Sequence, residues 1–352
     1  MSPLPRHPGE HALAGLGFPP RPEPAPSSTT RFPDGGTWRT ELPSCEGPAV
    51  LAAVLAESER LAVPLHRISQ GSGVWMLTDG EIGEMVDGCG ARGIELSLFL
   101  GPRGSWEPGA GGRSYDSSGP RARGRDQLAQ CVEDAERAVA LGVRSLLIAD
   151  EGVLWTLHRL RAAGRLPSDV TFKVSALVGP VNPASFAVWE RLGADSVNVP
   201  SDLTVAQLAE IRAMSPAPVD FYVEAPDDLG GFVRMYDAAE LIRCGAPIYL
   251  KFGLRNAPAL YPVGRHLLPA AVESGRERVR RGRLVLDTLA RLGADEGMSP
   301  VGARDPGPLR RFPAEPVPVT PLENGSPLPS SAPTQGPTHV PTHGTTPQGD
   351  TS

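Results

Sequence analysis

The chain has 352 residues, a formal net charge of −6 at pH 7 and a pI near 5.7, so it lacks the basic field that nucleic-acid binding requires. No run approaches the roughly 18 apolar residues of a membrane span, and residues 1–26 contain no continuous apolar stretch typical of a signal peptide. We therefore predict a cytoplasmic protein that binds neither nucleic acid nor membrane.

The two ends of the chain differ in composition from the middle. Residues 1–30 and residues 294–352 are rich in Pro, Ser and Thr and show no periodicity, which predicts disordered tails. They flank a core of residues 31–293. The length of this core is close to the roughly 250 residues of a single α/β barrel.

Short apolar runs alternate with segments of helical periodicity throughout the core. Strands are predicted at Thr37–Leu42, Pro64–Ser69, Ile94–Leu100, Val143–Ala149, Val170–Ala176, Asp195–Val199, Val219–Val223 and Ile248–Leu250. Helices are predicted at Pro48–Leu61, Thr78–Arg92, Asp126–Leu141, Val153–Gly164, Pro183–Leu192 and Thr204–Met214, between the last two strands, and at Leu267–Leu292. Thr78 with Glu81 forms a capping-box pattern, and Gly142, Gly193 and Gly245 each stand where a helix ends before a strand. The long Gly/Arg/Ser segment from Gly101 to Gly124 is a candidate lid.

Eight strands alternating strictly with eight helices require a parallel sheet with right-handed crossovers. The sequence therefore predicts the α/β class and a single closed (β/α)₈ TIM-type barrel. In this fold the carboxyl ends of the strands converge on the catalytic face. The catalytic candidates at or near these ends are Glu41, Asp150, Lys173, Glu224 and Lys251. The substrate-binding candidates are Arg67, Gln70, Arg103, Asn198, Asp202, Arg255 and Asn256.

The lysines are the most informative of these candidates. Among 34 basic residues only Lys173 and Lys251 are lysines, and both lie between apolar residues in predicted strands. A preference for Arg over Lys in a G+C-rich genome explains the depletion but not the positions of the two that remain. Lysine loses its proton readily when buried and then serves as a base or a Schiff-base amine, whereas arginine stays charged. The alternative is a structural ion pair, for example between Lys251 and Glu224.

Two of the three acidic residues Glu41, Asp150 and Glu224 could act as an acid/base pair. Together with His66 the three could also hold a divalent metal through oxygen and nitrogen ligands, so a metal is an open alternative to a site without a cofactor. Four single cysteines, Cys45, Cys89, Cys131 and Cys244, show no zinc or disulfide spacing and fit small buried apolar residues.

The core contains the segments RTELPS, HRISQGSGVWMLTD, KVSALVGPVNPASF, LGADSVNVPSDLT, DFYVEAPDDLGGFVR and YLKFGLRNAPALYP. Through these segments, residues 31–292 resemble the actinobacterial branch of the collagenase-like peptidase U-32 family. The resemblance implies a TIM-type barrel and a peptidase that acts on a peptide or small-molecule substrate. The family's cysteine-containing signature is missing here, so the resemblance implies no iron–sulfur cluster.

Three functions follow as hypotheses. The first is a U-32-type peptidase with Glu224 and Asp150 as acid and base and the two lysines as cationic partners or bases. The second is a lyase of the aldolase type in which Lys173 or Lys251 forms a Schiff base with a carbonyl substrate. The third is a barrel without catalytic activity that serves as a binding or accessory subunit.

Overall fold

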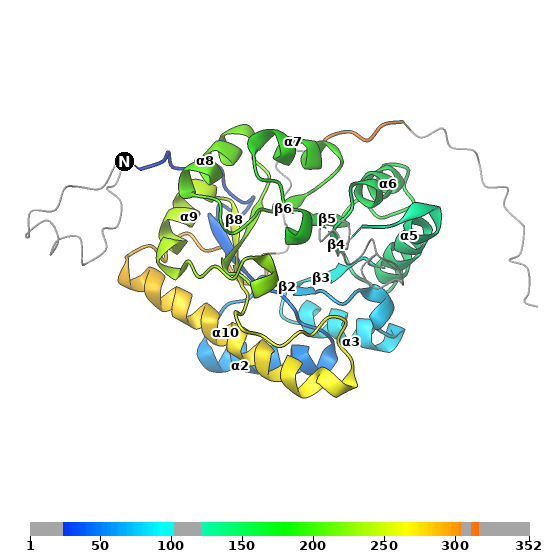
Figure 1. Cartoon of the computed structure of the whole chain (residues 1–352), viewed down its shortest axis with the longest axis horizontal. Coiled ribbons are helices and arrows are strands. Elements are labelled where there is room, and N and C mark those ends of the chain that lie inside the picture. The colour runs from blue at the N-terminus through cyan, green and yellow to red at the C-terminus, as the bar shows by residue number, and fades with distance from the viewer. Residues whose placement is uncertain (1–23, 102–120, 304–310, 317–352) are drawn as a thin grey trace, which may run out of the picture. The chain divides into compact units, whose positions relative to one another are not determined.

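The computed structural model describes residues 24–101, 121–303 and 311–316, and within them eight parallel strands close into a barrel (Figure 1). The strands are β1 (Trp38–Leu42), β2 (Arg67–Gln70), β3 (Glu95–Phe99), β4 (Ser145–Ile148), β5 (Thr171–Val174), β6 (Ser196–Asn198), β7 (Val219–Glu224) and β8 (Ile248–Phe252). The helices are α2 (Pro48–Leu61), α3 (Asp79–Gly90), α5 (Gly124–Ala140), α6 (Glu151–Ala162), α7 (Pro183–Arg191), α8 (Val205–Met214), α9 (Ala238–Gly245) and α10 (Leu268–Arg291). The predicted fold is confirmed. Most of the candidate lid, including Arg103, lies outside the described residues.

Local chemistry places the ends of several helices as predicted. Thr78 and Glu81 form the capping box of α3, each side chain bonding the other's backbone N–H. Gly142 and Gly193 adopt the positive φ angles that glycine tolerates best, +100° and +112°. Gly245 differs, because it is the last residue of α9 and has no positive φ. A Cβ there would lie 2.9 Å from a side-chain atom of Leu208, so close packing explains this glycine.

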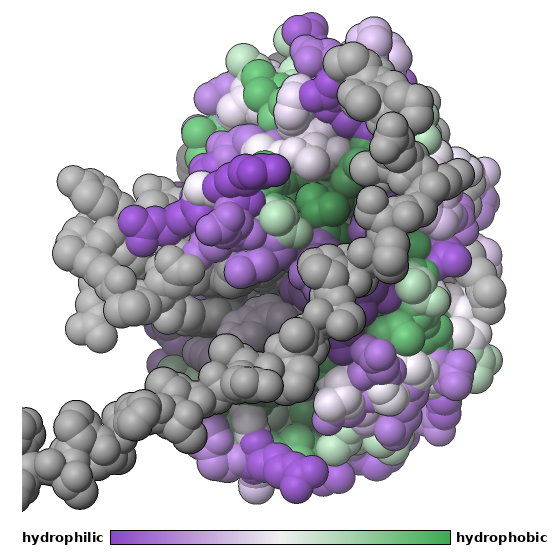
Figure 2. Space-filling view, turned by 90° about the vertical axis from the view of Figure 1, so that its right-hand side faces the viewer, coloured by the Kyte–Doolittle hydropathy of each residue, from purple (hydrophilic) through white to green (hydrophobic). Residues whose placement is uncertain are grey.

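The apolar core lies between the barrel and its helices. Residues on the outward face of the strands, such as Ile68, Phe172 and Phe252, are fully buried against helical side chains. Helix α10 lies along α2 on one side of the barrel (Figure 1). The face seen in Figure 2 mixes hydrophilic residues with small apolar patches, as expected of helices that bury only one side. No helix of the described residues is both long and apolar enough to cross a membrane.

The amino-terminal end of the barrel is covered by residues 297–299, which follow α10. Ser299 donates its backbone N–H to Trp38 O at 3.0 Å and accepts a hydrogen bond from Arg39 Nε at 3.0 Å. The carbonyl oxygen of Ser299 lies 2.9 Å from His66 Nε2, whereas His66 Nδ1 accepts the N–H of Thr40. His66 is thus part of this closure and lies away from the carboxyl ends of the strands. Burial lowers its pKa.

A second segment from a predicted tail also contacts the barrel. Arg243 donates to the carbonyl oxygen of Ala25 at 2.6 Å, and Ser28 N donates to Arg243 O at 2.8 Å. Within the described residues, segments 25–28, 297–299 and 311–316 therefore contact the barrel or its helices, the last through an ion pair between Arg311 and Asp195 at 2.9 Å. The domain boundaries after residues 30 and 293 stay a prediction.

Candidate active site

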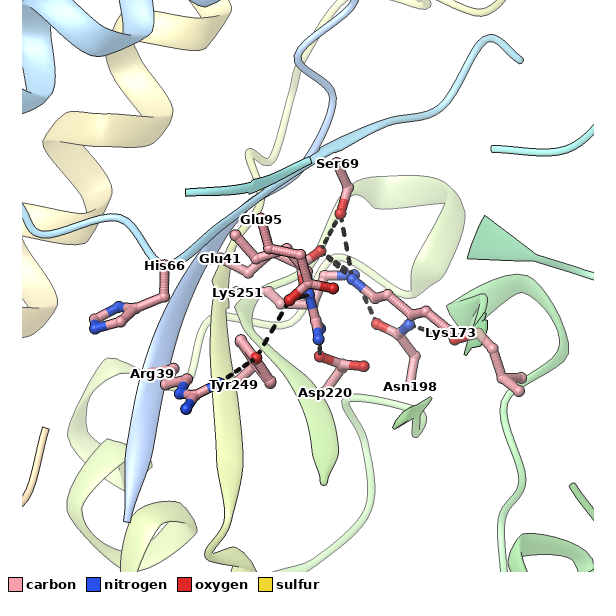
Figure 3. Close-up of polar contacts among 12 residues, drawn as sticks. Arg39, Glu41, His66, Ser69, Glu95, Lys173, Asn198, Asp220, Tyr249 and Lys251 are labelled. Carbon is pink, nitrogen blue, oxygen red and sulfur yellow. Dashed lines mark hydrogen bonds and ion pairs between the residues drawn. The ribbon is translucent and has the colours of Figure 1, made fainter. Parts of the chain in front are cut away.

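One buried carboxylate joins side chains from four strands inside the barrel. Glu41 on β1 is fully buried, and its Oε1 forms ion pairs with Lys173 on β5 and with Lys251 on β8, the latter at 3.2 Å. Ser69 on β2 donates to the same oxygen at 2.6 Å and lies 3.2 Å from Lys173 Nζ. Lys251 also donates to Asn198 Oδ1 at 2.6 Å. Figure 3 shows these side chains pointing toward one another from different sides of the barrel.

The two lysines have different electrostatic environments although they share Glu41. Burial lowers the pKa of Lys173 to about 7, with Lys251 and Arg67 acting in the same direction against the opposing carboxylates. Burial also acts to lower the pKa of Lys251, but Glu41 and Tyr222 outweigh it and raise this pKa above its ordinary value. At neutral pH, therefore, Lys251 is an ammonium and Lys173 is partly a neutral amine.

A second polar group lies deeper in the barrel, toward its amino-terminal end. Arg67 on β2 contacts three carboxylates: Nη1 lies 2.7 Å from Asp220 and 3.3 Å from Glu41, and Nε lies 2.9 Å from Glu95. Its guanidinium also lies over the ring of Tyr249, 3.6 Å from the centroid. The Arg67 contact with Glu41 links this group to the lysines. Burial raises the pKa of Asp220, against the opposing effect of Lys173 and Arg67.

A cavity of about 70 Å³ opens above the Glu41 group at the carboxyl ends of the strands. Its buried inner end includes Ser69 and Lys251, its walls include Ser175 and Tyr222, and the exposed Asp228 lines its outer part. Lys173 does not line this cavity but contacts Ser69, which does. The cavity therefore reaches both lysines, one directly and one through a single hydroxyl group.

Glu224 lies outside this group, contrary to its predicted position. A β-bulge between Tyr222 and Glu224 shifts the register, so that Glu224 pairs with Phe252, a residue of the outward-facing apolar core. The Glu224 carboxylate accepts the N–H of Arg255 at 3.0 Å and lies 3.4 Å from Arg281 of α10. The predicted pairing of Glu224 with Lys251 is therefore wrong, and Lys251 pairs with Glu41 instead.

Asp150 also lies apart from the Glu41 group. It is the N-cap of α6, where Oδ1 accepts the N–H of Val153 at 2.8 Å, and its Oδ2 accepts the N–H of Ala122 at 3.1 Å. Both oxygens thus accept backbone N–H groups, one in the first turn of α6 and one just before α5. Glu41, Asp150 and Glu224 do not form a shared site. Within the described part of the chain no cluster of three or more His, Cys, Asp or Glu side chains is arranged for a metal.

The predicted substrate-binding residues divide into two sets. Arg67 and Asn198 belong to the buried network, and Gln70 lines the cavity while bonding the N–H and carbonyl oxygen of Gly73 at 3.1 Å. Three further candidates lie at the surface, where Asp202 is exposed and Arg255 and Asn256 both bond Asp227, and Arg103 lies outside the described residues. The surface set is therefore not part of the cavity wall.

Several other inward-facing polar residues of the barrel were not among the predicted site residues. Ser69, Glu95, Asp220, Tyr222 and Tyr249 are among them, and each lies two residues along its strand, or a multiple of two, from another inward-facing polar residue. The signal that could have found them is period-two polarity. Helices cover the outside of such a barrel, so a polar residue inside an apolar strand must face the interior.

No protein-family model matches the chain, and no curated protein sequence matches it. Similar solved structures include the YdjI aldolase from Escherichia coli K12, at 14% identity over 74% of this chain and 93% of that chain with a TM-score of 0.44. They also include the U32 peptidase Mk0906, at 18% identity over 69% of this chain and 98% of that chain with a TM-score of 0.37. Further aldolases and lyases occur among them. At this level of similarity the neighbours carry no argument about the reaction.

Proposed function

We propose that the protein is a lyase of the aldolase type that forms a Schiff base between Lys173 and the carbonyl group of a small substrate. The observation that carries this proposal is a pair of buried lysines that share the carboxylate of Glu41, of which Lys251 lines the cavity and Lys173 contacts the cavity-lining Ser69. Schiff-base chemistry needs an unprotonated amine held in a desolvated site. Lys173, with its pKa lowered to about 7, meets that requirement, whereas Lys251 does not.

The charged interior supports a functional role for these residues. The inside of a TIM barrel is ordinarily filled by bulky branched apolar side chains. Here Glu41, Arg67, Lys173, Asp220 and Lys251 are all buried inside it. Replacing buried ion pairs by well-packed apolar residues is often neutral or stabilising, so the stability of the barrel alone does not require this network. A site that lowers the pKa of a lysine amine does require buried charged groups around that amine.

Reductive trapping tests the proposal. Because Lys173 and Lys251 are the only lysines in the sequence, borohydride reduction in the presence of carbonyl compounds gives few possible adducts. We expect a stable secondary amine on Lys173, located by peptide mass spectrometry. The adduct should be lost in Lys173→Met, a variant that keeps Lys251 and the terminal amine as internal controls. A panel of aldehydes, ketones and oxo acids that leaves Lys173 unmodified contradicts the proposal.

A second candidate function is hydrolysis, in keeping with the resemblance to U-32 peptidases. The observation that favours it is the 3.2 Å contact between Lys173 Nζ and Ser69 Oγ, because an unprotonated lysine can serve as the base for a serine nucleophile. Ser69 lines the cavity, but its hydroxyl donates to Glu41 at 2.6 Å.

Ser69→Ala separates the two functions. Under the hydrolase proposal it abolishes cleavage of a peptide library and labelling by a fluorophosphonate probe. Under the lyase proposal the Lys173 adduct still forms. A wild-type protein that neither cleaves the library nor reacts with the probe excludes the serine hydrolase.

A further inference from the structure

The cavity presents a fixed positive charge beside the proposed Schiff-base lysine. Lys251 is 2% exposed, lines the cavity, and is held by Asn198 Oδ1 at 2.6 Å, by Glu41 at 3.2 Å and by the ring face of Tyr222, whose centroid is 4.2 Å away. Both lysine amines contact the same oxygen of Glu41. A ligand that reaches Lys173 therefore brings its neighbouring atoms close to the Lys251 ammonium.

A second hydrogen-bond donor faces the same space. Ser175, directly after β5, accepts the N–H of Leu177 with its Oγ at 3.3 Å, which leaves its hydroxyl proton for a ligand. Ser175 is 6% exposed and lines the cavity together with Lys251. One ammonium and one hydroxyl match the donor requirement of a single carboxylate.

The outer part of the cavity limits the charge and size of that ligand. Asp228 lines the outer part, and the adjacent Asp227 contacts Arg255 and the N–H of Asn256. An acidic rim disfavours a phosphate group, which carries more negative charge than a carboxylate. A volume of about 70 Å³ holds only a few heavy atoms besides the reacting carbonyl.

We infer that the substrate is a small unphosphorylated 2-oxo acid, whose carbonyl carbon faces Lys173 and whose carboxylate binds Lys251 and the Ser175 hydroxyl. In a 2-oxo acid these two groups are on adjacent carbon atoms, which suits two amines that share one carboxylate oxygen. This inference rests on the proposed Schiff-base function and names its substrate class.

The reaction at Lys173 balances without an added co-reactant. The neutral amine forms a C–N bond to the carbonyl carbon, and the carbonyl electron pair moves to oxygen. This oxygen leaves as water after it has taken one proton from the amine nitrogen and one from a general acid, which leaves a protonated imine. Borohydride then delivers a hydride to the imine carbon and makes the adduct permanent.

The test compares pyruvate with hydroxyacetone, which replaces the carboxylate by a hydroxymethyl group and is otherwise matched in size. The fraction of Lys173 trapped by borohydride is measured as a function of the concentration of each carbonyl compound. The proteins compared are the wild type, Lys251→Met and Lys251→Arg. We expect pyruvate to half-saturate trapping at a concentration at least about tenfold lower than hydroxyacetone in the wild type, as one charge-assisted contact would give. The advantage should disappear in Lys251→Met and be partly kept in Lys251→Arg, which retains the charge.

The possible results separate the two levels of the proposal. If hydroxyacetone traps as well as pyruvate, the 2-oxo acid is overturned while the Schiff-base function stands. A preference that survives Lys251→Met overturns the role of Lys251. If no carbonyl compound modifies Lys173, the proposed function itself fails. Circular dichroism verifies that each variant is folded, and the wild-type comparison holds without any variant.

Discussion

Glu41 balances more positive charge than any other residue of the site. It contacts Lys173, Lys251 and Arg67 and accepts the hydroxyl of Ser69, all in the interior of the barrel. Burial acts to raise its pKa, but the three cations outweigh this and hold the pKa well below its ordinary value. The carboxylate also raises the pKa of Lys173, against the effect of burial. Glu41, together with Asp220, thus opposes the effect of burial on the Lys173 amine and increases its protonated fraction at a given pH.

Glu41→Gln should shift the reactivity of Lys173 toward lower pH. In the wild type, trapping should rise with pH and reach half its maximum near the Lys173 pKa of about 7. Without the Glu41 carboxylate, Asp220 still raises the pKa of Lys173, but it opposes burial, Lys251 and Arg67 with less support, so the midpoint should fall. The measurement is the pH dependence of borohydride trapping, with Glu95→Gln as control because Glu95 contacts Arg67 but neither lysine. An unchanged or higher midpoint in Glu41→Gln contradicts this role.

The same substitution should destabilise the fold by about 3–5 kcal/mol, the cost of leaving buried charges without their partner. Because the folded-state pKa of Glu41 is depressed, its stabilisation is present above the unfolded value near 4.3 and is lost as the pH falls through the folded value. Urea unfolding of the wild type and Glu41→Gln at pH 7, and at a series of pH values below about 4.3, measures both effects. Equal stability of the wild type and Glu41→Gln at pH 7 would count against the network.

The sequence identified part of this site and misplaced the rest for physical reasons. Glu41, Lys173 and Lys251 were predicted because strand ends of a parallel barrel converge on one face. Asp220 was missed because it is the second residue of β7, away from the strand end. Glu224 was misplaced because the bulge after Tyr222 reverses the direction of its side chain, and no residue pattern around it announces a bulge.

At the level of elements, α10 lies close to the barrel because two glycines face its neighbours. A Cβ on Gly282 would be 2.8 Å from a ring atom of Phe252 on β8, and one on Gly275 would be 3.0 Å from Val54 of α2. Glycine in a helix costs about 1 kcal/mol relative to alanine. Close helix packing therefore offsets that cost at these two positions.

Gly282→Ala should destabilise the protein by about 1–3 kcal/mol, because the added methyl group overpacks the contact with Phe252. The matched control is Gly83→Ala in α3, where a Cβ would meet nothing within 4 Å. There the better helix propensity of alanine should stabilise the protein by up to about 1 kcal/mol. Urea unfolding of both variants measures the change in the free energy of unfolding, which should be negative for Gly282→Ala and positive for Gly83→Ala. A Gly282→Ala variant as stable as the wild type would show that α10 can move away from the barrel at no cost.

The helices and strands could be predicted from the sequence because apolar residues recur with different periods in helices and in strands. The predicted span Pro48–Leu61 coincides with α2, and Thr78 begins α3 as its N-cap. The predicted strand Pro64–Ser69 begins three residues before β2, and the predicted strand Val143–Ala149 extends beyond β4 at both ends. Apolar residues continue past the last ladder hydrogen bond, so composition alone does not mark where a strand begins or ends.

On the scale of the whole molecule, the barrel is closed by the pairing of β1 with β8, and the chain after α10 returns to the same place. Met298 pairs with Trp38, the first residue of β1, and Thr37 donates its N–H to the carbonyl oxygen of Gly297 at 2.7 Å. Sequence composition placed the end of the core at residue 293, because the residues after it show no periodicity. A turn at residues 296–297 followed by the single bridge residue Met298 is too short to produce a periodic pattern.

A chain ending at residue 293 should be less stable than one ending at residue 303. The shorter chain loses Ser299, so Arg39 Nε and His66 Nε2 lose hydrogen-bond partners at 3.0 and 2.9 Å. A buried group left without a partner costs about 1–3 kcal/mol. In the longer chain, Ser299→Ala should show an intermediate loss, because it removes the contact with Arg39 and keeps the backbone contacts with His66 and Trp38. Equal urea midpoints for the two chain lengths would mean that residues 294–303 add nothing to the barrel and that the core ends at residue 293.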